Sequence, residues 1–183
     1  MKKALILLAN GFEESEALVT HDLLLRSKQM EVKLVSITSD KIVTASSGLA
    51  VVANELLNEI KDIDLYDFLV LPGGMPGVKN LFESLLVREI IKRFKEKGKH
   101  IHAICAAPSI LNAMGYLKDY SYTCFPSFQG KDGAYKIEKG VVLDKDTVTA
   151  KAMGYSIDFG LTIVEFELGK EAREIVEKSI LGK

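Results

Sequence analysis

Short, continuous apolar runs that alternate with amphipathic segments constrain the fold of this chain more than any other feature. Apolar runs of this kind are typical of parallel strands that are covered on both faces. Helical periodicity between them, at 13–28, 75–97 and 106–115, gives the β-α-β rhythm of a doubly wound sheet. The sequence therefore predicts an α/β fold with a mostly parallel sheet and helices on both faces. The strand-like runs are KALILLA (3–9), EVKLVSI (31–37), DFLVLPG (67–73) and HIHAIC (100–105).

The rest of the chain predicts additions to this sheet within a single domain, residues 1–183. The segment 41–54 has two strand-like runs around Ser46-Ser47-Gly48 and predicts a hairpin. Turns at Lys139-Gly140 and Asp144-Lys145-Asp146 divide 135–150 into antiparallel or edge strands. A helix through Leu168 is expected to stop at Gly169, and a second helix follows. We see no repeat, linker or low-complexity segment.

Composition and charge exclude several classes of function. The net charge is −1 and the lysines are dispersed, so no basic stripe indicates a nucleic-acid or membrane surface. The apolar N-terminal run is short and is followed by acidic residues, which favours a core strand over a signal peptide. No segment approaches the roughly 18 apolar residues that span a bilayer. We expect a cytoplasmic protein whose partner is a small molecule or another protein.

The two cysteines, Cys105 and Cys124, form no C-x-x-C pair, so neither a disulfide framework nor a zinc site is expected. Cys105 stands in HAICAAPSIL (102–111), where a strand ends and a helix begins at once. Pro108 is tolerated in a first helical turn, and the free N–H groups there favour a thiolate. Free cysteine is also commonly buried and inert. The turn alone leaves both interpretations open.

A cysteine nucleophile needs a partner, and the histidines do not supply an obvious one. His21, His100 and His102 all precede Cys105, and Ala106 occupies the place of an adjacent imidazole. The downstream histidine of an amidotransferase is missing as well. We expect His100 and His102 to be structural residues of their strand.

The acidic segment FEESEA (12–17) is the better candidate, because it follows the first strand and projects toward the same edge of the sheet. At 100° per residue, Glu16 falls on the stripe that carries Leu23 and Leu24, whereas Glu14 falls on the polar side. Glu13 lies at the helix mouth, where an acidic residue complements the helix dipole. Burial would raise the pKa of Glu16, so that the protonated carboxyl can donate a hydrogen bond to a thiolate.

The segment LPGGMPG (71–77) is the third component. Gly73 and Gly74 let the backbone approach a ligand closely and present N–H groups. Gly74 and Ala106 could together form an oxyanion hole for an attacked carbonyl. The Walker lysine and the G-x-G-x-x-G spacing are absent, so this is not a phosphate loop. A Pro-Gly-Gly segment alone is more often only a turn.

Taken in order and spacing, NGFEESEA, VLPGGMPG, HAICAAPSIL and GYSIDFGLTIVEFELGKE resemble the ThiJ/PfpI family, in the branch of the parkinsonism-associated protein. The resemblance covers nearly the full chain. It implies a flavodoxin-like fold, usually a homodimer, with a redox-sensitive cysteine at a strained elbow. The family cysteine matches Cys105, its protonated glutamate matches Glu16, and the glycine whose amide faces the sulfur matches Gly74.

The chain departs from that branch at two site positions. Phe125 stands where the parkinsonism-associated protein has a histidine before proline, and a bacterial subgroup shares this phenylalanine. Ser47 replaces an arginine that contacts the cysteine-bound anion. Arg26 matches a second arginine of the site and is a candidate anion contact.

The resemblance implies cofactor-free glyoxalase, protein deglycase, or chaperone and oxidative-stress activities, and older family descriptions add thiazole monophosphate biosynthesis. The leading hypothesis is that Cys105 attacks the aldehyde of a small dicarbonyl such as methylglyoxal, or acts on its protein adducts, without a metal or cofactor. The alternative is a redox-sensing stress chaperone in which Cys105 is oxidised and Cys124 acts as a second thiol. A thiol protease is a weaker alternative, because it needs a histidine from a partner chain.

Overall fold

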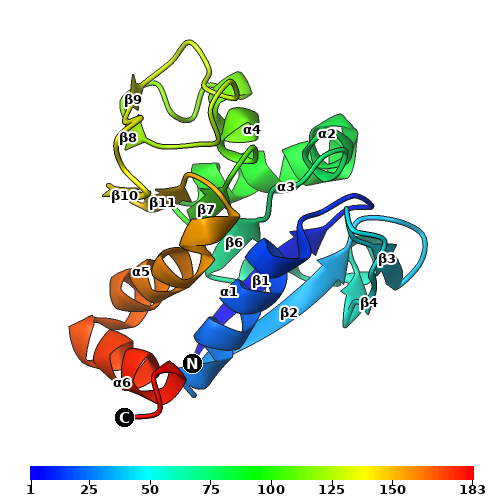
Figure 1. Ribbon diagram of the computed structural model, residues 1–183. Helices are drawn as coiled ribbons and strands as arrows, with labels where there is room; N and C mark the ends of the chain where they lie inside the picture. The colour runs from blue at the N-terminus through cyan, green and yellow to red at the C-terminus, as the bar shows by residue number, and fades with distance from the viewer.

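The computed structural model describes all 183 residues, and its central feature is a seven-stranded sheet in the order β10-β11-β7-β6-β1-β2-β5 (Figure 1). Neighbouring strands run parallel except β10 and β11, which form an antiparallel pair at one edge. The predicted α/β fold is therefore confirmed. The strands are β1 (Lys2–Leu8), β2 (Met30–Ser36), β5 (Glu55–Leu56), β6 (Phe68–Leu71), β7 (His100–Ile104), β10 (Val141–Asp144) and β11 (Thr147–Ala150).

Helices cover both faces of the sheet (Figure 1). One layer contains α1, α5 and α6, and the other contains α2, α3 and α4. The longest helices have 13 residues, and none of the helices has the length and apolarity that a bilayer crossing requires. The bounds are α1 (Glu14–Arg26), α2 (Gly77–Glu83), α3 (Leu85–Glu96), α4 (Pro108–Ala113), α5 (Ser156–Leu168) and α6 (Lys170–Ile180), with short 3-10 turns η1 (Leu57–Glu59), η2 (Ile63–Leu65) and η3 (Met153–Tyr155).

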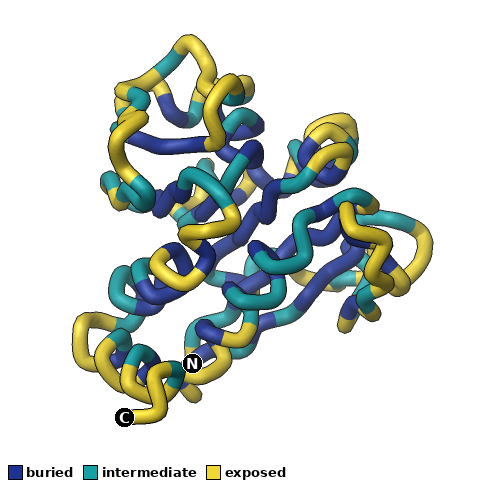
Figure 2. Tube along the Cα trace, in the orientation of Figure 1, coloured by how far each residue is buried: buried dark blue, intermediate teal, exposed yellow.

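The sheet divides the interior into two cores. Because successive side chains of a strand point to opposite faces, Ile6 and Leu8 of β1 pack in the core of α1, α5 and α6, whereas Leu5 and Leu7 pack in the core of α2, α3 and α4. Each core contains 23 buried residues, which explains why the strands are apolar throughout rather than alternately. Figure 2 shows the buried strands between helices whose outer surfaces are exposed.

The order of the strands reverses at β1. β2 lies on one side of it, whereas β6 and then β7 lie on the other. Ligands of open α/β sheets bind at such a point, outside the carboxyl ends of the strands. The segments that follow β1, β6 and β7 are 9–11, 72–74 and Cys105. The three strand ends singled out in the sequence therefore lie at one edge of the sheet.

The predicted hairpin at 41–54 is confirmed as the antiparallel pair β3 (Ile42–Thr44) and β4 (Ala50–Val52). It is joined to the loop after β1 by two backbone hydrogen bonds. The Gly11 N–H donates to the Thr44 carbonyl at 2.7 Å, and the Ser46 N–H donates to the Phe12 carbonyl at 2.7 Å. The hairpin therefore lies beside the start of α1.

The segment 135–150 forms β10 and β11 with the expected turn, in which Lys145 has a φ of 52°. Its first residues belong elsewhere: β9 (Ala134–Tyr135) pairs with β8 (Ser121–Tyr122) in a separate two-stranded sheet. Gly169 ends α5 as predicted, with a φ of 94°.

Two helical predictions were too long. The helix expected at 75–97 is interrupted at Ser84, whose N–H donates to the Asn80 carbonyl and whose hydroxyl accepts from the Val87 N–H. Ser84 thus closes α2 and caps α3, as serine commonly does at helix starts. The helix expected at 106–115 is limited to α4, because Cys105 and the residues after it form a turn first.

Candidate active site

Cys105 directly follows β7 in a conformation that L-residues rarely adopt. Its φ is 63°, which costs about 1–2 kcal/mol relative to the right-handed form. Its N–H donates to the Ala150 carbonyl of β11 at 2.9 Å, and its carbonyl accepts from the Phe125 N–H at 2.8 Å. The strained elbow implied by the resemblance is confirmed. The cysteine side chain lies against both cores.

Glu16 is fully buried in the first turn of α1, as its helical phase predicts. The Glu13 carboxylate caps the helix and accepts a hydrogen bond from the Glu16 N–H at 2.6 Å. One carboxyl oxygen of Glu16, Oε2, accepts from the Gly73 N–H at 2.7 Å. The other, Oε1, is buried and has no hydrogen-bond partner. Glu16 is therefore fixed at one oxygen and free to react at the other.

The glycines after β6 make this arrangement possible. A Cβ atom at Gly73 would lie 2.6 Å from Cys105 Cβ and 2.6 Å from Glu16 Oε2, so any larger residue would separate the thiol from the carboxyl. Gly74 has a φ of 88°, and a Cβ there would meet the Glu13 nitrogen at 2.4 Å. The sequence indicated a close backbone approach at these glycines. It did not indicate that the Gly73 amide binds Glu16.

The pKa values of the pair show how a proton can be exchanged. Burial raises the pKa of Glu16 to about 7, against the opposing effect of the Gly73 hydrogen bond, which confirms the expected direction. Burial and the adjacent Glu16 carboxylate raise the pKa of Cys105 to about 12, although hydrogen bonds from the Ala106 and Gly74 amides lower it.

The shift at the thiol is opposite to the direction that the helix N-terminus predicts. The physical reason is that burial disfavours the thiolate and the adjacent Glu16 carboxylate repels it, and these effects outweigh the hydrogen bonds from the Ala106 and Gly74 amides. Cys105 is therefore protonated at neutral pH, and any reaction at its sulfur requires a base that takes the proton. Glu16 is next to it and has a pKa suited to that role near neutral pH.

A small pocket of about 180 Å³ opens at the sulfur. Met75 and Phe128 line it in addition to the predicted Phe125, and sequence reasoning missed both. Met75 follows the Gly-Gly segment, which could have drawn attention to it. Phe128 lies in a loop without regular structure, and no pattern in the sequence indicates its position. The complete lining is Gly74, Met75, Cys105, Ala106, Phe125 and Phe128.

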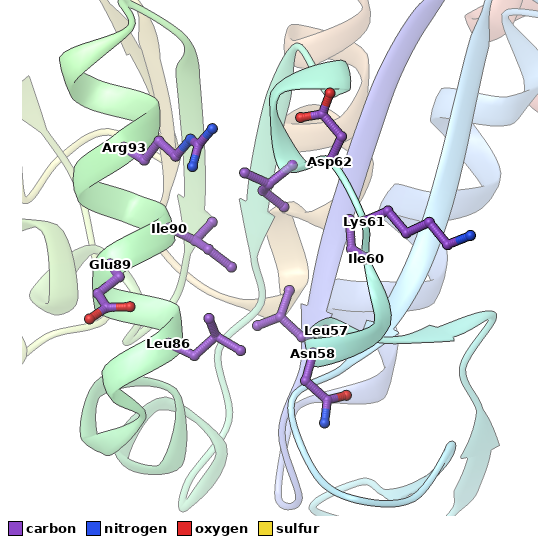
Figure 3. A pocket seen from close by; sticks show the side chains of 10 residues that line it. Leu57, Asn58, Ile60, Lys61, Asp62, Leu86, Glu89, Ile90 and Arg93 are labelled. Carbon is purple, nitrogen blue, oxygen red and sulfur yellow. The ribbon is translucent and has the colours of Figure 1, made fainter.

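A larger cavity of about 280 Å³ lies elsewhere, between α3 and the segment that contains η1 and η2 (Figure 3). Leu86, Ile90 and Arg93 of α3 face Leu57 and its neighbours across it (Figure 3). It contains neither cysteine nor histidine, and its lining does not include the carboxyl ends of β1, β6 or β7. We therefore place the chemistry at the smaller pocket.

Arg26 does not reach the Cys105 pocket of its own chain, and its role as an anion contact stays a prediction. Arg26 lies in the last turn of α1, ten residues beyond Glu16 and so about 15 Å along the helix axis. Its Nε donates to Asp22 at 2.6 Å on the surface. Ser47 lies in the hairpin loop and hydrogen-bonds Glu14, which lowers the pKa of that carboxyl. The hairpin thus reaches the start of α1 without providing a positive charge.

Cys124 is fully buried, and burial raises its pKa to about 11. It immediately precedes Phe125, whose N–H binds the Cys105 carbonyl. Cys124 therefore lies in a segment attached to the elbow, but it is shielded from solvent. Its role as a second thiol stays a prediction.

The histidines of β7 are structural, as expected, and their partner is Glu167 of α5. Glu167 Oε1 lies 2.6 Å from His100 Nδ1 and 3.3 Å from His102 Nε2, and Lys2 Nζ lies 3.1 Å from Glu167 Oε2. Their ligand atoms are close enough together to hold a metal ion. However, the Val148 N–H donates to His102 Nδ1 at 3.0 Å, so the ring proton is on Nε2 and points at the carboxylate. This hydrogen-bonding pattern fits an ionic network rather than a metal site.

The remaining histidine, His21, lies in the second turn of α1, and burial lowers its pKa. None of the three imidazoles hydrogen-bonds Cys105. Within this molecule no histidine pairs with Cys105, as the order of residues in the chain predicts. Glu16 is the acid–base group that the fold places beside the thiol.

Comparison with known proteins agrees with this geometry. Protein DJ-1 homolog B of Arabidopsis thaliana is 35% identical over 173 residues, covering 93% of this chain but only 39% of that longer protein. The protein named glutathione-independent glyoxalase DJR-1.2 of Caenorhabditis elegans is 34% identical over 174 residues, covering 93% of this chain and 91% of that one.

Solved structures show the same fold. The crystal structure of a cysteine-to-alanine variant of a DJ-1 superfamily protein from Salmonella typhimurium superposes with a TM-score of 0.91 at 33% identity, over 99% of this chain and 98% of that one. The expected flavodoxin-like α/β architecture is thereby confirmed. The DJ-1/PfpI family model matches residues 2–166. Because this match covers most of the chain, including Cys105 and Glu16, and a relative is 34% identical over 93% of it, this chain belongs to the DJ-1/PfpI family.

Proposed function

We propose that the protein is a cysteine-dependent, cofactor-free enzyme of the glyoxalase or deglycase type, acting on small 2-oxoaldehydes or their protein adducts. The observation that supports this most directly is the pairing of Cys105 with a buried Glu16, whose pKa is about 7, across Gly73. The relative from Caenorhabditis elegans that is named as a glyoxalase agrees with this reaction.

In the first step, Cys105 Sγ attacks the aldehyde carbon of a 2-oxoaldehyde such as methylglyoxal while its proton passes to Glu16. The C–S bond forms, and the carbonyl electron pair moves onto oxygen. The amides of Gly74 and Ala106, which already point at the sulfur, would stabilise this oxyanion. Protonation of the oxygen by Glu16 gives a hemithioacetal and restores the carboxylate.

In the second step, Glu16 removes the hydrogen of the former aldehyde carbon as a proton, and the C–H electron pair forms a C=C bond while the ketone oxygen becomes an enolate. Glu16 then returns that proton to the neighbouring carbon, and the hydroxyl proton passes from the former aldehyde oxygen to the former ketone oxygen. The product is a 2-hydroxy thioester, so the two carbons exchange oxidation level within one molecule. Water then cleaves the thioester to the 2-hydroxy acid and the free thiol. The overall reaction adds one water and needs no external oxidant or reductant.

The test is the formation of lactate from methylglyoxal by the purified protein, by Cys105→Ser and by Glu16→Gln. We expect both substitutions to reduce turnover by at least about 100-fold, the lower range for loss of an acid–base group. Cys124→Ser is the matched control, because that thiol is buried away from solvent. Lactate formation that survives either Cys105→Ser or Glu16→Gln would rule the assignment out.

Redox sensing is the second candidate, favoured by one observation. Cys105 is only partly buried, and two amides together with Glu16 surround the sulfur, so an oxidised sulfur would have hydrogen-bond donors. The raised pKa of the thiol argues against high sensitivity to peroxide, because the thiolate is the reactive form. Intact-mass measurement during peroxide titration tests whether Cys105 acts as a redox sensor. Gain of two oxygen atoms on Cys105 at low peroxide favours sensing, and an unchanged mass excludes it.

A further inference from the structure

The pocket at Cys105 is lined almost entirely by apolar groups. Apart from the thiol, its lining side chains carry neither charge nor a hydrogen-bonding group. The rings of Phe125 and Phe128 lie 6.3 Å apart at 71°, in edge-to-face contact. Phe125 and Met75 remain 44% and 49% exposed, so each has a free surface that a bound molecule can cover.

The size of the pocket sets the size of its occupant. Ligand pockets commonly reach about 300–1,000 Å³, and this one, at about 180 Å³, is smaller. An apolar cavity of about 150 Å³ is known to accommodate one benzene molecule. One ring, or a branched alkyl group of similar size, therefore fits beside the aldehyde that reacts with the sulfur.

The surrounding charges exclude a different class of occupant. Glu13, Glu14 and Glu16 lie together in or beside the first turn of α1, at the same edge of the sheet as Cys105. Arg26 is at the far end of that helix, and Ser47 carries no charge. An anionic substituent would thus meet neighbouring carboxylates without a compensating cation from this chain.

We infer that the site selects 2-oxoaldehydes with a neutral aryl or branched alkyl substituent, and that Phe125, Phe128 and Met75 determine this specificity. The inference rests on the proposed glyoxalase-type reaction and names its substrate class. Anionic 2-oxoaldehydes are disfavoured, and methylglyoxal is a poorer substrate because its methyl group leaves most of the pocket unfilled.

The first experiment compares kcat/KM for phenylglyoxal, for phenylglyoxal with a para carboxylate and for methylglyoxal. Each value is divided by the rate of the same aldehyde with a free thiol, which removes differences in intrinsic reactivity. We expect phenylglyoxal to exceed each of the others by about tenfold or more, the scale that apolar pocket contacts provide. Phe125→Ala should reduce that preference to about threefold or less, mainly through KM. Phe82→Ala is the matched control, because Phe82 has similar exposure (37%) and lies on α2 outside the pocket.

The second experiment does not depend on turnover. Alkylation of Cys105 by iodoacetanilide, iodoacetamide and iodoacetate is followed by intact mass, with Cys105→Ser as the blank and a free thiol as the reference. After division by the reference rates, iodoacetanilide should be the fastest and iodoacetate the slowest. Phe125→Ala should reduce the advantage of the anilide, whereas Phe82→Ala should not.

The outcomes separate this inference from the reaction on which it rests. Turnover that requires Cys105 but shows no aryl preference, or a preference that Phe125→Ala leaves unchanged, overturns the inference and leaves the proposed function standing. If turnover does not require Cys105, the proposed function fails, and the alkylation rates then decide whether the pocket prefers neutral aryl groups. Equal normalised alkylation rates would overturn the inference in either case.

Discussion

Gly73 is the residue on which the contact between thiol and carboxyl depends. Its backbone φ is not in the left-handed region, so alanine is excluded only by the atoms that its Cβ would meet, which are Cys105 Cβ, Glu16 Oε2 and the Ile104 carbonyl oxygen. We expect Gly73→Ala to lower turnover by about 100-fold, because displacing reacting groups by about 1 Å has an effect of this size. Crowding of the buried site should also lower the free energy of unfolding by about 1–3 kcal/mol.

Gly154→Ala is the control for this change, because a Cβ there meets no atom within 4 Å. Its free energy of unfolding should stay within about 0.5 kcal/mol of the wild-type value. Activity is measured as lactate formation and stability by urea titration. Wild-type turnover in Gly73→Ala would show that the close approach of Cys105 and Glu16 is not required.

The buried Glu16 carboxyl should make the free energy of unfolding depend on pH. Its pKa is about 7 in the folded protein and near 4.5 when unperturbed. The folded state therefore binds more protons between these values, so stability is fully present below pH 4.5 and is lost as pH rises through 7. A rise from 4.5 to about 7 corresponds to about 3 kcal/mol.

Glu16→Gln removes this titration, so its stability relative to wild type should increase by about 3 kcal/mol between pH 4.5 and pH 8. Urea unfolding at several pH values measures it. Glu14→Gln lies in the same turn, but its pKa is lowered by Ser47, so it should show no such increase. Parallel stability curves for wild type and Glu16→Gln would contradict a raised carboxyl pKa.

The site residues differ in how far their positions could be predicted from the sequence. Helical phase located Glu16, because a period of 3.6 residues reports which face of a helix is buried. Strand ends located Cys105 and Gly74. Arg26 came only from family resemblance, and within one chain its place in the last turn of α1 keeps it away from Cys105. Met75 and Phe128 depend on how loops fold over the strand ends, and local sequence carries little information about that.

At the scale of elements, β7 and α5 are joined by the Glu167 network. Burial raises the pKa of the Glu167 carboxyl, but hydrogen bonds from His100 and His102 outweigh this and lower it overall. Burial also lowers the pKa of His102. Both groups therefore contribute stability that is present at neutral pH. The stability that His102 contributes is lost as the pH falls below about 6.5, and the stability that Glu167 contributes is lost as it falls below about 4.5.

Glu167→Gln should lower the free energy of unfolding at pH 7 by about 3 kcal/mol, because it leaves the buried partners of an ion network without their carboxylate. It should also flatten the loss of stability below pH 4.5. Glu165→Gln is the control on the same helix, where the carboxylate pairs with Arg173 at a partly exposed position and should contribute less than about 1 kcal/mol. Equal effects of the two substitutions would show that the buried network does not join β7 to α5.

Some signal for this network was present in the sequence. His100 and His102 stand two residues apart on a strand, so they share a face, and Glu167 stands between the apolar residues Phe166 and Leu168. Local patterns could not indicate that the histidines contact Glu167, because 65 residues separate His102 from it. The break between α2 and α3 was missed for the opposite reason, because Ser84 caps a helix inside a stretch whose periodicity continues.

At the scale of the whole molecule, we expect the chain to form a homodimer through the β3–β4 hairpin. The hairpin projects from the body of the protein (Figure 1), and its side chains Ile42, Leu49 and Val52 are at least half exposed. Exposed apolar side chains that gather on one element are typical of protein contacts. Light scattering should give about 40 kDa, twice the 20.2 kDa of the chain.

Val52→Lys should shift this mass toward that of a single chain. Leu143→Lys is the control, because Leu143 is similarly exposed on β10 at the other end of the sheet. A monomeric wild type would contradict the expected dimer. A dimer that only Leu143→Lys dissociates would place the contact at the opposite edge.

The architecture itself was predictable because both faces of the sheet are covered. Continuous apolar strands separated by helices admit few alternatives, since parallel strands need crossover helices and these must bury one face each. The small sheet of β8 and β9 and the loops around residues 114–135 were not predictable in the same way, because these two strands have only two residues each.

The position of Cys105 between the two cores has a consequence for the molecule as a whole. A group attached to that sulfur stays on the chain when it unfolds, so it changes the free energy of unfolding by the interactions that it makes or breaks only in the folded state, where Cys105 packs against both cores. The melting temperature then depends on whether the sulfur is free, acylated or oxidised. Calorimetry of the protein during a reaction could therefore distinguish covalent states of a single atom without any spectroscopic label.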